Sequence, residues 1–185
     1  MSKSALVILA PGAEEMEFVI SADVLRRAGI SVTVAGLKGA DDVKCSRDIV
    51  IKPDATFESV AQKQFDVVVM PGGLGGSNAM AESSAFGEFL KKQEASGKLI
   101  AAICAAPIAL AAHGVCVGKS LTSYPSVKDK LADKYKYVDD KKVVQDGQLI
   151  TSRGPGTAFD FALEVSKALV GEQKANEVAK AMLLQ

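Results

Sequence analysis

Histidine, cysteine and tryptophan are scarce in this sequence, which has one histidine, three cysteines and no tryptophan. A structural zinc site needs about four Cys or His ligands at short spacings. Cys45, Cys104 and Cys116 are not arranged in that way, so we expect no metal and no cofactor bound through metal ligands. An odd number of cysteines also provides no disulfide framework, which favours a reducing, cytoplasmic compartment.

An excess of charge of one sign is also missing. Lys and Arg together number 22, Asp and Glu together number 22, and the net charge at pH 7 is +0. Binding to nucleic acid or to an anionic membrane depends on clustered positive charge, so this balance argues against both partners. Residues 1–10 hold one lysine and a six-residue apolar run, which is too short for a signal peptide or a membrane span.

The composition is typical of a globular protein. Of the 185 residues, 48% are hydrophobic and 24% are charged, which is enough apolar material for a substantial core. No linker, internal repeat or low-complexity tract divides the chain. The sequence therefore predicts a single domain over residues 1–185.

Short apolar runs alternate with segments of helical spacing over the first two thirds of the chain. We predict buried strands over residues 5–10, 30–35, 66–70 and 99–103, with helices over 14–28 and 84–96 and from Pro107 onward. Residues 45–51 are expected to be extended, and residues 57–64 weakly helical. This alternation predicts the α/β class, with a mostly parallel sheet and helices on both faces.

The last third follows a different pattern. We predict a short strand over 120–124, a helical turn over 127–134, a hairpin over 138–152 that turns at Asp146 and Gly147, and helices over 157–170 and 174–184. Ligands of parallel α/β proteins bind at the carboxyl ends of the strands. Three segments are expected there: Pro11–Glu17, Pro71–Gly76 and Cys104–Pro107.

Cys104 is the candidate nucleophile. It ends a strand and stands three residues before a proline suited to the first turn of a helix. Free backbone N–H groups and the helix dipole would then favour a thiolate near neutral pH. The alternative is a buried, inert thiol. Cys45 and Cys116 lack this context, and we assign them to packing or incidental oxidation.

The glycine-rich loop and the acidic segment are the other candidates. Pro71–Gly76 reads PGGLGG, which is either a tight turn or an oxyanion hole made of N–H groups. Among Glu14, Glu15 and Glu17, a carboxyl close to a thiolate would keep its proton and could shuttle it. The pattern alone does not select one of the three.

His113 lies nine residues after Cys104, roughly 13 Å along the predicted helix. We therefore exclude a Cys–His dyad within one chain and expect His113 to be a cation at a helix end.

Taken together, four motifs resemble the PfpI-like superfamily and, within it, the Parkinson-disease-associated branch often called DJ-one. They are ALVILAPGAEEME (residues 5–17), VVMPGG (68–73), AAICAAP (101–107) and TSRGPGT (151–157), and CSRD (45–48) agrees with them. The resemblance covers essentially the whole chain. It implies a flavodoxin-like three-layer sandwich with an extra C-terminal helix, a homodimer, and no metal or organic cofactor.

The resemblance also implies residue roles. Cys104 matches the oxidation-sensitive nucleophile, and Glu17 matches the buried protonated acid beside it. Gly72 and Gly73 match the neighbouring loop, and the N–H groups of Gly73 and Ala105 match an oxyanion site. Arg47, together with Arg27, matches basic residues near the pocket at the dimer interface.

Two positions depart from the superfamily pattern. Close relatives have a histidine where this chain has Tyr124, and protease-like members have one where it has Ala105. This argues against an imidazole base and against peptidase activity. Glu17 would then carry the proton, with water or the Tyr124 hydroxyl in the substrate pocket.

The expected function is a cysteine-dependent deglycase or glyoxalase that acts on methylglyoxal, glyoxal and their adducts on proteins. The alternative is a non-enzymatic redox sensor with chaperone-like character, regulated by oxidation of Cys104 to sulfinate. Both use the same sulfur. The resemblance implies mitochondrial and nuclear pools beside the cytoplasmic one.

Overall fold

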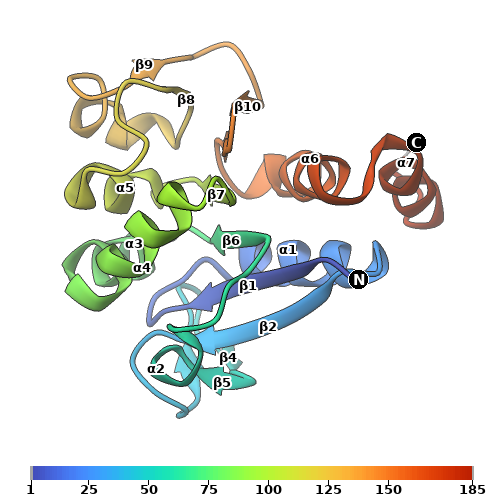
Figure 1. Ribbon diagram of the computed structural model, residues 1–185, viewed down its shortest axis with the longest axis horizontal. Coiled ribbons are helices and arrows are strands. Elements are labelled where there is room, and N and C mark those ends of the chain that lie inside the picture. The colour runs from blue at the N-terminus through green and yellow to red at the C-terminus, as the bar shows by residue number, and fades with distance from the viewer. Residues whose placement is uncertain (1, 185) are drawn as a thin grey trace.

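A seven-stranded sheet forms the centre of the computed structural model, which describes residues 2–184 (Figure 1). The strand order is β10-β11-β7-β6-β1-β2-β5. The strands are β1 (Ser4–Leu9), β2 (Ser31–Gly36), β5 (Ala55–Thr56), β6 (Val67–Met70), β7 (Leu99–Ile103), β10 (Val143–Asp146) and β11 (Leu149–Ser152). All neighbours pair in parallel except β10 and β11.

Two small sheets flank the large one. β3 (Val43–Lys44) pairs antiparallel with β4 (Val50–Ile51), and β8 (Ser120–Leu121) pairs parallel with β9 (Lys136–Tyr137). The α-helices are α1 (Glu15–Arg27), α2 (Phe57–Val60), α3 (Leu74–Glu82), α4 (Ser84–Ala95), α5 (Pro107–His113), α6 (Ala158–Val170) and α7 (Glu172–Ala181). Two 3₁₀ segments span Pro125–Lys130 and Pro155–Thr157.

The helices form two layers because of the order in which the chain visits the strands. It passes from β1 through α1 to β2, then returns across β1 to β6 and continues to β7. Since parallel crossovers are right-handed, this reversal places α1 on one face and α3 to α5 on the other. α6 packs on α1 and α7 on α6, while α3 and α4 pack on α5 (Figure 1). This arrangement confirms the predicted three-layer sandwich with a C-terminal helix.

The central strands consist of apolar, largely β-branched residues because both of their faces are covered. Every residue of β6 is fully buried, and β7 is buried from Ile100 onward. Such strands read as continuous apolar runs rather than alternating ones. Because β6 pairs in parallel with both β1 and β7, the carboxyl ends of these three strands lie side by side. Each strand leads into one of the three segments singled out above.

Two local predictions are wrong. Residues 74–76 are not loop, because α3 starts at Leu74. Residues 45–51 are not one extended piece: residues 45–49 turn from β3 into β4, with Asp48 in the left-handed region at φ 68°, and only Val50–Ile51 are strand. The helical turn predicted over 127–134 is present with shifted bounds, as a 3₁₀ segment over Pro125–Lys130.

The single-domain assignment stays a prediction. Within residues 2–184, no helix combines the length and the apolar character needed to cross a membrane.

Candidate active site

Cys104 occupies the bend between β7 and α5 in a left-handed conformation, with φ at 63°. For a residue with a Cβ this costs roughly 1–2 kcal/mol, so the surroundings must impose it. They do so at both peptide groups: the Cys104 N–H donates to the Ser152 carbonyl at 3.0 Å, and the Tyr124 N–H donates to the Cys104 carbonyl at 2.8 Å. The bend therefore holds the side chain in one place, with 8% of the residue exposed.

Glu17 reaches the same place from the first turn of α1. Its side chain is fully buried, and its Oε2 accepts a hydrogen bond from the Gly72 N–H at 2.7 Å. Its own N–H is capped by Glu14 Oε2 at 2.8 Å, which fixes the start of the helix. Oε1 is buried and has no partner at hydrogen-bond geometry among residues 2–184.

Burial raises the pKa of Glu17 to about 7. The hydrogen bond from Gly72 and the interaction with the Cys104 thiol both lower this pKa, and the charge of Glu14 raises it. Near neutral pH the carboxyl is therefore present in both forms, so it can either hold or accept a proton.

Gly72 lies between the two functional side chains and leaves no room for a larger residue. A Cβ on Gly72 would come 2.5 Å from the Cys104 Cβ and 2.7 Å from Glu17 Oε2. Gly73 has φ 78°, and a Cβ there would meet the Gly12 carbonyl oxygen at 2.4 Å. The PGG sequence thus allows the three strand ends to approach one another closely.

The expectation that the Cys104 thiol ionises by itself near neutral pH is not met. Burial raises its pKa to about 12, with a further increase from the Glu17 charge. Hydrogen bonds to the sulfur from the Gly73 and Ala105 N–H groups lower this pKa. The Ala105 N–H belongs to the turn before α5, which begins only at Pro107, and the Gly73 N–H belongs to the N-cap residue of α3.

The structure places the remaining predicted residues, Tyr124, Arg47 and Arg27, in three different surroundings. Tyr124 contacts Cys104 through its backbone, while its ring packs near Gly154 and the residue is 46% exposed. Arg47 belongs to the β3–β4 turn, where its side chain donates to the Ser46 carbonyl. Arg27 does not belong to the site, because it lies at the other end of α1, about 15 Å along the axis from Glu17.

His113 lies in the last turn of α5, away from the sulfur as predicted. Its Nε2 lies 2.9 Å from the Met80 carbonyl oxygen, and its ring fills the space beside Gly87.

The sequence pattern assigned no role to Ser152 and did not single out Glu15 among the three candidate acids. Ser152 contacts Cys104 because β11 pairs with β7 in a register that only the folded sheet defines. Glu15 is 3% exposed and accepts hydrogen bonds from the Ser46 hydroxyl and the Arg47 N–H, both at 2.7 Å. The only sequence signal for Glu15 was its place in the acidic segment.

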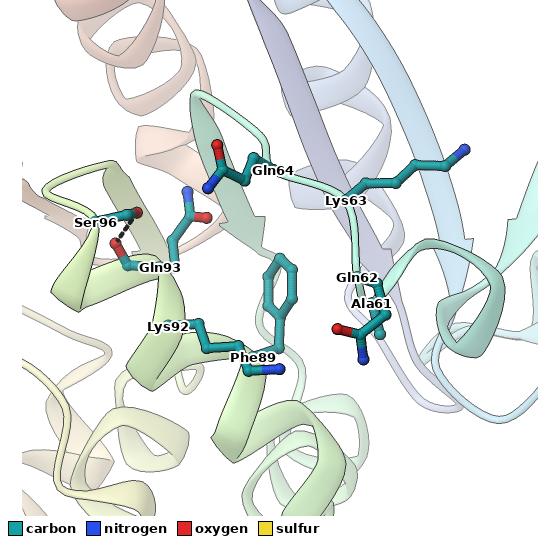
Figure 2. A pocket seen from close by; sticks show the side chains of 8 residues that line it. All are labelled: Ala61, Gln62, Lys63, Gln64, Phe89, Lys92, Gln93 and Ser96. Atoms are coloured by element: carbon teal, nitrogen blue, oxygen red, sulfur yellow. Dashed lines mark hydrogen bonds between the residues drawn. The ribbon is translucent and has the colours of Figure 1, made fainter.

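A cavity of about 220 Å³ lies elsewhere, between α4 and the segment that precedes β6. It is lined by Ala61, Gln62, Lys63, Gln64, Phe89, Lys92, Gln93 and Ser96 (Figure 2). Figure 2 shows Lys63 directed away from the Phe89 ring. The Gln93 side-chain amide donates hydrogen bonds to the Phe65 and Leu99 carbonyls. This cavity is lined by no cysteine and no carboxyl group, so the Cys104 bend is the better candidate.

Comparisons with known proteins find relatives that match this chain over nearly its whole length. The model of the DJ-1/PfpI family matches residues 3–168. Protein dj-1beta of Drosophila melanogaster is 68% identical over 184 residues, covering 100% of this chain and 98% of that protein. Its crystal structure superposes with a TM-score of 0.98 over 99% of this chain and 98% of that chain.

Two more distant relatives have informative names. Glutathione-independent glyoxalase DJR-1.2 of Caenorhabditis elegans is 46% identical over 184 residues, covering 98% of this chain and 97% of that protein. The oxidized DJ-1 of Toxoplasma gondii is 35% identical and superposes with a TM-score of 0.93, covering 98% of each chain.

Proposed function

The chain belongs to the DJ-1/PfpI family, and from this premise we propose that it is a cysteine-dependent glyoxalase and deglycase. The observation that carries the proposal is the fully buried Glu17 carboxyl, which binds the Gly72 N–H at the point where Gly72 touches Cys104. The Gly73 and Ala105 N–H groups lower the pKa of the thiol at the same place. A nucleophile next to a group that titrates near neutral pH is the arrangement that acyl and carbonyl chemistry needs. The glyoxalase name of the Caenorhabditis elegans relative supports the same class of reaction.

The first step is attack of the Cys104 sulfur on the aldehyde carbon of methylglyoxal. Glu17, as carboxylate, accepts the thiol proton while the C–S bond forms, so no free thiolate has to accumulate. The proton then passes to the former carbonyl oxygen, which gives a hemithioacetal. The N–H groups of Gly73 and Ala105 would stabilise the developing negative charge in this region.

The second step moves a proton from the hemithioacetal carbon to the neighbouring carbonyl carbon, with Glu17 as the shuttle. This internal redox step leaves a lactoyl thioester on Cys104, and water hydrolyses it to lactate and the free thiol. Overall, methylglyoxal and one water give lactic acid. With an adduct on a protein side chain, the Cys104 sulfur would attack the carbinol carbon while the C–N or C–S bond to that side chain breaks. Glu17 would pass the thiol proton to the departing amine or thiol, and the same hemithioacetal would result.

The test is lactate formation from methylglyoxal by wild type, Cys104→Ser and Cys116→Ser. We expect Cys104→Ser to lose lactate formation and Cys116→Ser to keep it. Unchanged lactate formation by Cys104→Ser would end the proposal.

A second candidate function is redox sensing by the same sulfur. It is favoured by the N–H groups that already surround the sulfur and by the oxidized state of the Toxoplasma gondii relative. Peroxide would convert the thiol to a sulfenic and then a sulfinic acid, with two peroxide molecules reduced to water. Intact mass after mild peroxide treatment tests this, and failure of Cys104 to gain two oxygens selectively would remove it.

We also propose that the chain forms a homodimer through an apolar region that we call the α1–β4 surface, made of Met16, Val19, Ile49 and Val50. Each of these side chains is at least 50% exposed. α1 and β4 lie side by side there, and Val19 and Ile51 line one groove of about 320 Å³. Exposed apolar clusters of this kind mark interaction sites. Light scattering of wild type and Val50→Asp tests the dimer, and a monomeric wild type would contradict it.

A further inference from the structure

Glu15 is a buried carboxylate that the chemistry proposed above does not use. It stands in the first turn of α1, two residues before Glu17, and is 3% exposed. Oε2 accepts from the Ser46 hydroxyl and Oε1 accepts from the Arg47 N–H, each at 2.7 Å. Burial raises the pKa of Glu15, but these hydrogen bonds and others from the backbone outweigh burial and lower it.

Both partners of Glu15 belong to the Cys45–Asp48 turn between β3 and β4. The Cys45 N–H donates a hydrogen bond to the Ile49 carbonyl at 2.8 Å, and the left-handed backbone of Asp48 allows the chain to turn there. It is also joined to the loop after β1, because the Ser46 N–H donates to the Ala13 carbonyl at 2.8 Å.

The loop after β1 connects the end of β3 on one side to Gly72, beside the sulfur, on the other. The Gly12 N–H donates to the Lys44 carbonyl at 2.9 Å, and the Glu14 N–H donates to the Gly72 carbonyl at 3.0 Å. The Gly72 N–H is the donor to Glu17. A continuous set of hydrogen bonds therefore runs from the Cys45–Asp48 turn to the Cys104–Glu17 pair.

On its outer side the same turn continues into Ile49 and Val50, which are 53% and 57% exposed. These two residues form half of the α1–β4 surface. The turn thus lies between the surface proposed for a second copy and the reactive pair.

We propose that Glu15 is a positioning residue that clamps the Cys45–Asp48 turn to α1 and so transmits the seating of a second copy to the Cys104–Glu17 pair. The proposal rests on the proposed dimer and deepens the proposed function, because it concerns regulation of the same site. A loosened clamp would let the loop after β1 relax and admit water to Glu17.

The first experiment measures the rate of Cys104 alkylation by iodoacetamide against pH. The titratable groups that face Glu17 are Glu14 on its own segment and Cys104 on the β7–α5 bend. Water reaching Glu17 would reduce the desolvation that raises its pKa. We therefore expect Glu15→Gln to lower the midpoint of the profile by about half a pH unit or more.

Asp66→Asn is the matched control. Asp66 also joins separate segments through its carboxylate, since it accepts from the Ser4 N–H and from Lys98, both at 2.9 Å. It lies before β6, at the amino end of the sheet, so Asp66→Asn should lower thermal stability without moving the midpoint. An unmoved midpoint in Glu15→Gln as well would reduce Glu15 to a structural role and overturn the proposal.

Two further variants keep the test decisive. Ser46→Ala removes one hydrogen-bond partner of Glu15, in the partly exposed turn, and should shift the midpoint in the same direction as Glu15→Gln. It replaces Glu15→Gln in the test if that variant does not fold. Val50→Asp should shift the midpoint as well, and it should add nothing in a Glu15→Gln or Ser46→Ala background because both changes break one path. Additive shifts, or a wild type that is monomeric, would overturn the transmission.

Failure of this proposal is distinguishable from failure of the proposed function. Alkylation needs no turnover, so a protein that consumes no methylglyoxal still reports on the clamp. If the protein forms lactate but Glu15→Gln does not move the midpoint of Cys104 alkylation, the proposed function stands and the proposed role of Glu15 is wrong.

Discussion

Cys104 and Cys116 have much in common but differ in what surrounds the sulfur. Both are buried, both have left-handed backbones at φ 63° and 56°, and each lies beside a glutamate. Burial raises the pKa of each thiol to about 12. Backbone strain, burial and a neighbouring acid are therefore shared by the two cysteines and do not distinguish them.

The difference lies in how deeply the two carboxyl groups are buried and in the N–H groups near each sulfur. Glu94 is partly exposed, and its Oε1 accepts the backbone N–H of Cys116 at 2.8 Å. Glu17 is fully buried and keeps one oxygen without a partner at hydrogen-bond geometry in the described chain. At Cys104, moreover, two N–H groups are directed at the sulfur. The two sites therefore differ in the burial of the carboxyl group and in the N–H groups that act on the sulfur, and we expect reactivity to follow these two differences.

The largest expected effect is selective oxidation and alkylation. Under mild peroxide, wild type should add two oxygens to Cys104 while Cys116 stays reduced, and iodoacetamide should prefer Cys104 by about 100-fold. Peptide mass spectrometry of wild type, Cys104→Ser and Cys116→Ser measures both. Equal modification of the two cysteines would break the comparison.

The next effect separates the two glutamates. Glu17→Gln cannot accept the thiol proton, so the rate of Cys104 alkylation at pH 7 should fall about 100-fold and lose its midpoint near 7. Glu94→Gln should leave both the rate and the profile unchanged. The measurement is the alkylation rate from pH 5 to 9, and a similar response of the two variants would contradict the assignment.

A third prediction concerns stability against pH. The pKa of Glu17 is raised from 4.5 to about 7, so its contribution is fully present below pH 4.5 and is lost as pH rises through 7. Relative to Glu17→Gln, wild type should therefore lose about 3 kcal/mol of unfolding free energy between pH 4.5 and 8. Urea unfolding of the two proteins measures this, and parallel pH profiles would show that Glu17 titrates normally.

The smallest effect is expected at Cys116. Glu94→Ala removes the acceptor of the Cys116 N–H, which should cost about 1–2 kcal/mol of unfolding free energy. Lactate formation and Cys104 alkylation should not change. A loss of activity that exceeds the loss of folded protein would show that the two regions are coupled.

The sequence predicted those parts of the site that depend on local pattern. The β7 strand, the Cys104 bend and the helix from Pro107 follow from the apolar run and the position of the proline. Gly75 and Gly76 favour a loop in a prediction from local pattern because glycine normally disfavours helix. In the fold they begin α3, where Cβ atoms would come 3.2 Å from the Gly12 Cα and 2.9 Å from the Ala13 Cα. Close packing, not turn geometry, accounts for these glycines.

The electrostatics of the site could not be predicted from local pattern. A cysteine before a helix suggests a low thiol pKa, but the depth of burial depends on how β11 and α1 pack around it. The resemblance selected Glu17 among the three acids, and the geometry places it beside Gly72 and Cys104. The contact of Ser152 with Cys104 depends on pairing between distant strands.

The two edge strands of the large sheet, β5 and β10, bear on whether the protein aggregates at high concentration. An incoming strand from another molecule needs a long row of unpaired amide and carbonyl groups. β5 offers two residues directly after Pro53 and Asp54, and β10 is a short strand preceded by Lys141 and Lys142. Growth of aggregates by strand addition to the large sheet is therefore disfavoured even when the protein is abundant.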